Sequence, residues 1–269
     1  MKNENLKQNR PLSYSSLKAF DTTPNHLVAY WNKEKEPTPA QEFGTLIHSL
    51  ILEPEKFDSL YYIINDAEIC AELITGGAKY PRATSIYKNW LAEILMQNEG
   101  KKEVKLKDYQ TALKLAESAR KSILLKKLKG VEELIEWDFA GQPFKGFVDG
   151  YGDGFILDIK TSADASPKAF LRDFVKYKYY WQAALYLHAN RALNFAGNNP
   201  DFFVLVVETS TPYNTQIYKV SPEFIDKGFA QVAAAVQSFK DWDGSAAGYE
   251  FGEILAENGV LTLNLPEWI

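Results

Sequence analysis

The stretch Phe144 to Thr161, FKGFVDGYGDGFILDIKT, carries the strongest pattern in the chain. Apolar and aromatic residues on both sides of Gly150, Gly152 and Gly154 predict two strands, and the dipeptide Asp153-Gly154 favours a tight hairpin turn between them. Glycines placed between two strands differ from a dinucleotide-binding loop, which joins a strand to a helix. The stretch therefore predicts a β-hairpin at the centre of the fold.

Three charged residues interrupt these apolar runs: Asp149 near the end of the first strand, then Asp158 and Lys160 in the second. Side chains alternate along a strand, so Asp158 and Lys160 share a face. A carboxylate within so apolar a strand is costly unless it is paired. Because Mg²⁺ takes one or two carboxylates plus waters and phosphate oxygens, a metal site fits two converging carboxylates, with Lys160 orienting or deprotonating a water or stabilising charge. The alternative is a salt-bridged hairpin, which the apolar flanks of Asp158 disfavour.

Composition limits the class of protein. The chain has 269 residues, of which 46% are hydrophobic, enough for one large domain. The single cysteine, Cys70, excludes an internal disulfide and a Cys-rich zinc site. No apolar run has the length of a membrane span, and the polar N-terminus lacks a signal peptide, so we expect a cytoplasmic protein. The net charge of -5 gives no global basic signature of a nucleic-acid binder, although a nuclease can concentrate its basic residues in one groove.

The order of the predicted elements favours an α/β fold with a central mixed sheet flanked by helices. Helices are predicted at 12–20, in a second segment that ends at about residue 31, and at 40–52, 66–75, 82–98, 108–127, 167–174, 179–195 and 222–242. Strands are predicted at 59–64, 131–139, 143–161, 202–209 and 215–220. We expect a single domain, residues 1–269. Its parts are a mostly helical elaboration at 1–107, a core of αβββαβ order at 108–242, and a tail at 243–269.

The helix predicted at 108–127 is amphipathic. Its inner face holds Ala112, Leu115, Ala119 and Ile123, and the segment 101–107 before it reads as basic and exposed. Its outer face is basic, with Lys114, Arg120, Lys121 and Lys126. That face is either simply solvated or part of a groove that follows phosphates.

Further polar residues lie on predicted helices. His48 is at the edge of the apolar face of the helix at 40–52, and is either a hydrogen-bonded core residue or a metal ligand. Gln182 and Tyr186 share one helix face, which either forms an interface or reaches the metal site or DNA. The chain has no phosphate loop and no G-x-S-x-G elbow, which leaves an ATP-driven motor and an acyl hydrolase unsupported.

Together these motifs resemble the RecE-type exonucleases, relatives of exonuclease VIII encoded by phages and prophages, within the PD-(D/E)xK nuclease superfamily. GFVDG and ILDIKT resemble the two metal-binding strands, at Asp149, Asp158 and Lys160. The segments that resemble the other family motifs are LSYSSLKAFDTTPNHL, the Gly-x-x-x-His motif at Gly44 and His48, the Gln-x-x-x-Tyr motif at Gln182 and Tyr186, and the tail LTLNLPEWI. The resemblance implies a restriction-endonuclease-like core.

The resemblance also implies an activity. A family member digests linear double-stranded DNA from 5′ ends with Mg²⁺ or Mn²⁺ and leaves a 3′ single strand for an annealing protein. Some members form a ring-shaped tetramer. Asp149, Asp158 and His48 would hold metal, Lys160 would position the attacking water, and Gln182 and Tyr186 would contact the substrate.

The superfamily often adds a carboxylate upstream of the first Asp. The candidates are Glu132, Glu133 and Glu136. Strand alternation puts Glu132 and Glu136 on one face and Glu133 on the other. Alternation therefore does not select one of the three candidates. The family motif favours Glu133.

Two other functions fit the same residues. One is a PD-(D/E)xK endonuclease, or a nuclease of other polarity. The other is a DNA-binding or scaffold module that has lost cleavage, against which the retention of Asp149, Asp158 and Lys160 speaks.

Overall fold

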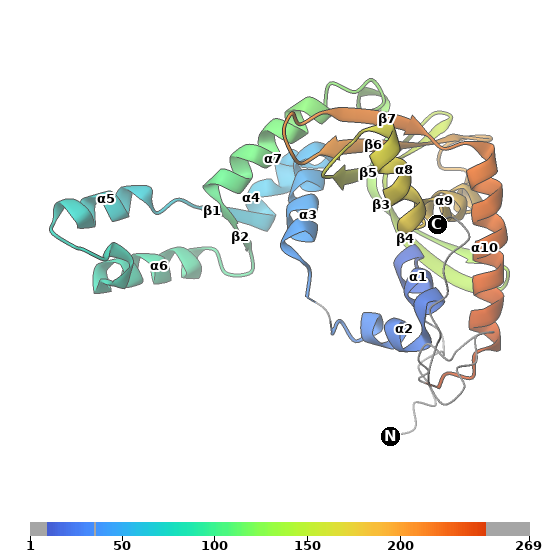
Figure 1. Ribbon diagram of the computed structural model, residues 1–269, viewed down its shortest axis with the longest axis horizontal. Coiled ribbons are helices and arrows are strands. Elements are labelled where there is room, and N and C mark those ends of the chain that lie inside the picture. The colour runs from blue at the N-terminus through green and yellow to red at the C-terminus, as the bar shows by residue number, and fades with distance from the viewer. Residues whose placement is uncertain (1–9, 35, 246–269) are drawn as a thin grey trace, which may run out of the picture.

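A five-stranded mixed sheet lies at the centre of the computed structural model, which describes residues 10–34 and 36–245 (Figure 1). The strands follow the order β3-β4-β5-β6-β7, and only β5 and β6 are parallel. Their bounds are β3 Gly130–Phe139, β4 Gln142–Gly152, β5 Phe155–Ser162, β6 Asp201–Glu208 and β7 Thr215–Lys219. Helices flank this sheet, which confirms the predicted α/β class.

Two apolar cores lie on the two faces of the sheet. Alternate residues of β5 divide between them: Ile156 belongs to the first core, and Leu157 and Ile159 belong to the second. The first core is closed by helices α1 Tyr14–Thr22, α2 Pro24–Trp31, α8 Pro167–Lys176, α9 Tyr179–Leu193 and α10 Pro222–Asp241. The second is closed mainly by α3 Pro39–Leu52 and α7 Leu106–Ala119. Helices from the N-terminal part therefore pack directly on the nuclease-like sheet.

The two tight turns, between β3 and β4 and between β4 and β5, use left-handed backbone. Ala140 and Gly141 join β3 to β4 with φ of 55° and 77°, as a two-residue turn of this kind requires. Gly154 has φ of 78° in the turn between β4 and β5, where the sequence predicts one. These turns set the register that brings the polar residues together.

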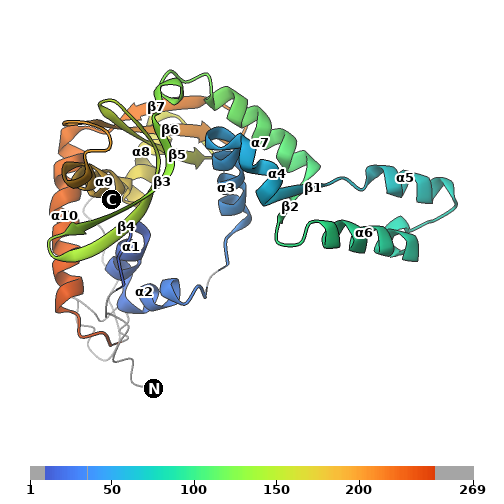
Figure 2. The same ribbon diagram turned by 180° about the vertical axis from the view of Figure 1, so that it is seen from behind.

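A helical arm projects from the sheet domain in both views (Figures 1 and 2). It contains α5 Ala67–Thr75 and α6 Ser85–Gln97, and neither helix has a buried residue. Its base is a small parallel sheet of β1 Tyr61–Ile64 and β2 Lys102–Lys105, beside the short helix α4 Phe57–Leu60. Single 3₁₀ turns lie at Pro54–Lys56, Pro81–Ala83 and Leu125–Lys127.

Two details differ from the sequence predictions. The segment 101–107 contains strand β2, because Val104 is buried while its charged neighbours face solvent. Helix α7 ends at Ala119, so Ile123 is 58% exposed and does not belong to the inner face. Ala112, Leu115 and Ala119 are fully buried, as predicted.

No helix in the described ranges combines the length and the apolar character needed to cross a bilayer. The predicted C-terminal tail lies, from residue 246 onward, outside those ranges.

Candidate metal centre

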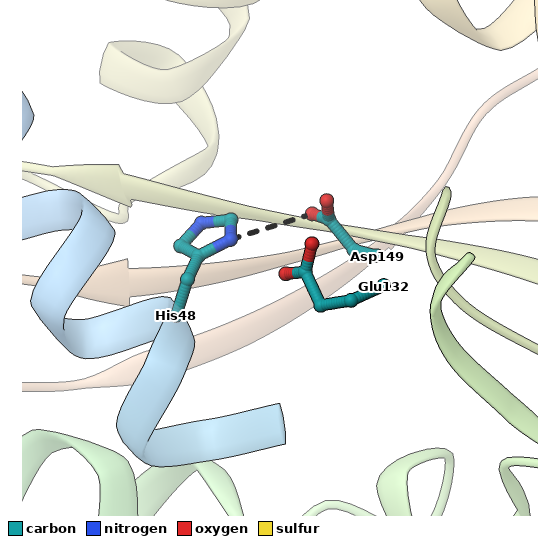
Figure 3. A group of neighbouring side chains, drawn as sticks. All are labelled: His48, Glu132 and Asp149. Carbon is teal, nitrogen blue, oxygen red and sulfur yellow. Dashed lines mark ion pairs between the residues drawn. The ribbon is translucent and has the colours of Figure 1, made fainter. Parts of the chain in front are cut away.

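Three side chains from three elements converge beside the sheet: His48 of α3, Glu132 of β3 and Asp149 of β4 (Figure 3). Each offers one ligand atom, and these atoms lie within 4.8 Å of one another. One imidazole and two carboxylates form a donor set that can bind a divalent cation. The residues fit a divalent metal site.

Glu132 reaches the site because of the register of the first hairpin. The ladder pairs Val131 with Gly150 and Glu133 with Val148, so Glu132 lies opposite Asp149. Glu132 itself leaves the ladder, with a left-handed φ of 47°. Opposed residues of an antiparallel pair lie on the same face, which brings the two carboxylates side by side.

Glu133 does not join this cluster. Its side chain accepts a hydrogen bond from the Tyr151 hydroxyl on the exposed side of the hairpin. The structure thus places Glu132, rather than Glu133, beside His48 and Asp149. Glu136, the third candidate, lies opposite Lys145, farther along the hairpin.

Asp149 lies where β4 separates from β5. The two strands pair only from Gly150–Leu157 to Gly152–Phe155. Beyond that point the Ile159 amide donates its hydrogen bond to Asp149 Oδ2, at 2.6 Å, in place of a backbone carbonyl. The carboxylate is therefore fixed by the same divergence that opens space for a ligand.

His48 is positioned by the close approach of α3 to β5. A Cβ on Gly44, one helical turn before His48, would lie 3.1 Å from Thr161 Oγ1. The absence of a side chain at Gly44 thus lets the helix lie close to β5. His48 Nδ1 then lies 3.7 Å from Asp149 Oδ2.

Asp158 and Lys160 form a separate, connected unit next to the cluster. Lys160 Nζ lies 2.8 Å from Asp158 Oδ1 and 2.7 Å from Oδ2. Gln182 of α9 donates to Asp158 Oδ1 at 2.7 Å and accepts from Lys160 at 3.1 Å. Asp158 is only 2% exposed. Gln182 thus holds the predicted catalytic pair in one geometry.

Tyr186 has a different contact from the one expected for a substrate-binding residue. Its hydroxyl donates to the Phe147 carbonyl at 2.6 Å, and its ring packs over Gly146 of β4. Tyr186 therefore fixes the strand that carries Asp149.

The protonation of these groups follows from burial and from their mutual charge. Burial, together with the charge of Asp149, raises the pKa of Glu132 to about 7. Burial also raises the pKa of Asp149, and raises that of Asp158 to about 6. At Asp149 and Asp158, burial outweighs the opposing charge of Lys160, so the single ammonium does not offset the desolvation of the carboxylates. A divalent ion would supply the missing positive charge.

His48 and Lys160 differ in their protonation. Burial and then the charge of Lys160 lower the pKa of His48 to about 4, so at neutral pH its imidazole is uncharged and can donate a lone pair to a metal. Burial lowers the pKa of Lys160, but the carboxylates of Asp158 and Asp149 outweigh it and the net pKa is raised. In the metal-free protein the two carboxylates therefore hold Lys160 as a charged ammonium.

These residues open into a cleft of about 950 Å³. The cleft is lined by Glu132, Asp149 and Lys160 from the sheet, by His48 from α3, and by Lys18 from α1. The Tyr179 ring lies 4.9 Å from Lys160 Nζ and covers the ammonium group. Neither Lys18 nor Tyr179 carries a sequence signal of its own, since each becomes part of the site only through packing.

A family model, the PDDEXK-like domain of unknown function DUF3799, matches residues 13–246. A crystal structure titled "Putative exonuclease" from Eubacterium rectale is similar over 98% of this chain and 93% of that one, with a TM-score of 0.54 and 14% identity. A crystal structure of SSO0001 covers 73% of this chain and 85% of that one, with 14% identity and a TM-score of 0.29, too low to indicate a common fold. No curated protein matches the sequence.

The family model spans most of the chain, including both carboxylate strands and the helices that carry His48 and Gln182. It supports membership of the PD-(D/E)xK superfamily and a nuclease activity, and leaves the narrower RecE-type assignment open. The chain belongs to the PDDEXK-like DUF3799 family.

Proposed function

We propose that the protein is a metal-dependent exodeoxyribonuclease that digests linear double-stranded DNA from 5′ ends and leaves 3′ single strands. The observation that carries the proposal is the convergence of His48, Glu132 and Asp149 beside the Asp158–Lys160 pair at one cleft. The sequence motifs of RecE-type enzymes support the polarity, and the name of the Eubacterium rectale neighbour supports an exonuclease.

The residues would divide the work as follows. His48, Glu132 and Asp149 would hold Mg²⁺ or Mn²⁺, with Asp158 at the edge of the site. The ion, when bound, lowers the pKa of water and neutralises charge on the phosphate. Lys160, held as a charged ammonium by Asp158 and Gln182, would orient the attacking water and stabilise charge that develops on the phosphate oxygens.

The remaining parts of the proposal concern partners. The substrate is the end of a DNA duplex, and the 3′ strand passes to a single-strand annealing protein. By resemblance to RecE-type enzymes, the chain would act as a ring-shaped tetramer in a bacterial or phage-infected cytoplasm.

The test is digestion of end-labelled linear duplex beside a closed circle, with and without Mg²⁺. Asp158→Asn is compared with Asp153→Asn, a matched change in the exposed turn where Asp153 pairs with Lys129. We expect metal-dependent loss of 5′ label from linear DNA only, abolished by Asp158→Asn and retained by Asp153→Asn. Cutting of the circle would instead establish an endonuclease, and binding without cutting would establish an inactive module.

A further inference from the structure

A second groove, of about 700 Å³, lies beside the catalytic cleft. Its charged lining is mostly basic, with Arg10, Lys33 and Lys145 against a single acid, Glu36. This local excess is notable in a chain whose net charge is -5. The groove concentrates positive charge in one place, as an anionic ligand requires.

Aromatic side chains line the same groove. Tyr30 is 47% exposed, so its ring is accessible to a ligand in the groove. Trp31 also lines the groove, and the guanidinium carbon of Arg10 lies 5.4 Å from its ring centre. Cations and open aromatic faces together are the features that bind unpaired nucleic acid, where phosphates meet the cations and bases stack on the rings.

The groove and the catalytic cleft are lined by neighbouring residues of the same two segments of the chain. Ser13 and Pro37 line the groove, while Ser15 and Thr38, close to them in sequence, line the cleft. The two spaces therefore adjoin at these two short segments.

Strand β4 also connects the groove with the catalytic cleft. Lys145, Phe147 and Asp149 are alternate residues and so share one face of the strand, the face turned away from α9. Phe147 is 56% exposed between the basic residue and the metal ligand. Four residues of strand span roughly 13 Å, a distance that a few nucleotides cover.

We propose that this surface, here named the strand groove and made of Arg10, Tyr30, Trp31, Lys33, Lys145 and Phe147, binds one unpaired strand of DNA that leads into the catalytic cleft. The inference rests on the proposed function in so far as the strand is the substrate. A duplex fits the surface poorly, because paired bases do not present their faces to Tyr30 and Phe147. A second basic pair, Lys114 of α7 and Lys121 just beyond the end of that helix, lies away from the groove's aromatic lining.

The test measures binding of fluorescein-labelled oligothymidine by anisotropy, without divalent metal so that no cleavage occurs, over a range of salt concentrations. The groove variant Lys33→Gln/Lys145→Gln is compared with a matched variant, called the α7 variant, that combines Lys114→Gln in α7 with Lys121→Gln just beyond its end. Loss of two phosphate contacts is expected to flatten the slope of log K against log salt by about 1.4, since each contact to a single strand contributes about 0.7. The α7 variant is expected to keep the wild-type slope.

A second pair of variants tests stacking. Tyr30→Ala and Phe147→Ala are each expected to weaken oligothymidine binding by about fivefold or more, and to leave the salt slope unchanged. Thermal melts of all variants establish that they fold. A groove variant that melts normally and binds like wild type would overturn the inference, as would a loss of slope in the α7 variant instead.

The outcome for the groove separates from the outcome for the proposed function. If the wild type shows Mg²⁺-dependent digestion while the groove variants bind oligothymidine normally, the groove is refuted and the nuclease stands. If the wild type does not cut DNA but the groove variants lose oligothymidine binding, the nuclease is refuted and the groove stands.

Discussion

Replacement of Glu132 by Gln should change stability in opposite directions with and without metal. In the metal-free protein, Glu132 faces Asp149, and burial and charge raise its pKa from 4.5 to about 7. Without screening by solvent, this rise in pKa corresponds to about 3 kcal/mol in the free energy of unfolding. Partial solvent access of the side chain reduces it to about 1–2 kcal/mol.

The sign follows from which form the folded protein prefers. A raised carboxyl pKa favours the protonated form, so its contribution to stability is present at low pH and is lost as pH rises to about 7. Gln resembles the protonated form at every pH. Glu132→Gln should therefore stabilise the metal-free protein at pH 8, raising its melting temperature by roughly 2–8 °C, and should have little effect at pH 5.

In Mg²⁺ the result should reverse. The wild type gains stability from metal binding at pH 8, and Glu132→Gln should lose most of this gain together with nuclease activity, because one of three converging ligands is gone. Glu133→Gln is the matched control. Glu133 accepts a hydrogen bond from Tyr151 and lies outside the metal cluster, so this substitution should change neither melting nor activity appreciably. Thermal melts at both pH values, with and without Mg²⁺, supply the measurement. The reasoning is refuted if Glu133→Gln loses the metal response, or if Glu132→Gln destabilises the metal-free protein at pH 8.

Three other predictions concern the groups around the metal. Lys160→Ala should lower kcat by about 10²-fold or more while the Kd for DNA changes little, because its contact matters mainly in the transition state; equal losses in both would contradict this. Gln182→Leu should reduce activity by about 10–100-fold, since Gln182 orients Asp158 and Lys160, and a variant with wild-type turnover would exclude that role. Gly44→Ala should press α3 away from β5, because the new Cβ would lie 3.1 Å from Thr161 Oγ1; we expect a fall in kcat of about tenfold through displacement of His48, with a change in unfolding free energy below about 1 kcal/mol.

Much of the fold follows from local patterns in the sequence. The hairpin around Gly154 depends on turn residues and alternation, and the helices that carry His48 and Gln182 depend on spacing within one turn or two. The pairing of Asp158 with Lys160 on one face follows from the two-residue period of a strand. Such features need no knowledge of distant parts of the chain.

The choice between Glu132 and Glu133 needed the register between two strands. A turn at Ala140-Gly141 places Glu132 opposite Asp149, so this turn was the signal that brings Glu132 into the cluster. Alternation alone assigns each residue of a strand to one of two faces. It does not say which residue of the neighbouring strand lies opposite. A left-handed backbone at Glu132 then takes the residue out of the ladder.

Sequence alone determined that this chain carries a hairpin with two aspartates and a lysine, set among helices that supply His48 and Gln182. Tertiary structure decided which groups meet: Glu132 with His48 and Asp149, and Asp158 with Lys160 and Gln182. It also decided that residues 102–105 form a strand and that Ile123 faces solvent. The physical reason is the distance along the chain over which each effect acts. Propensity and periodicity act over a few residues, whereas a metal centre depends on the packing of elements that lie up to a hundred residues apart in the chain.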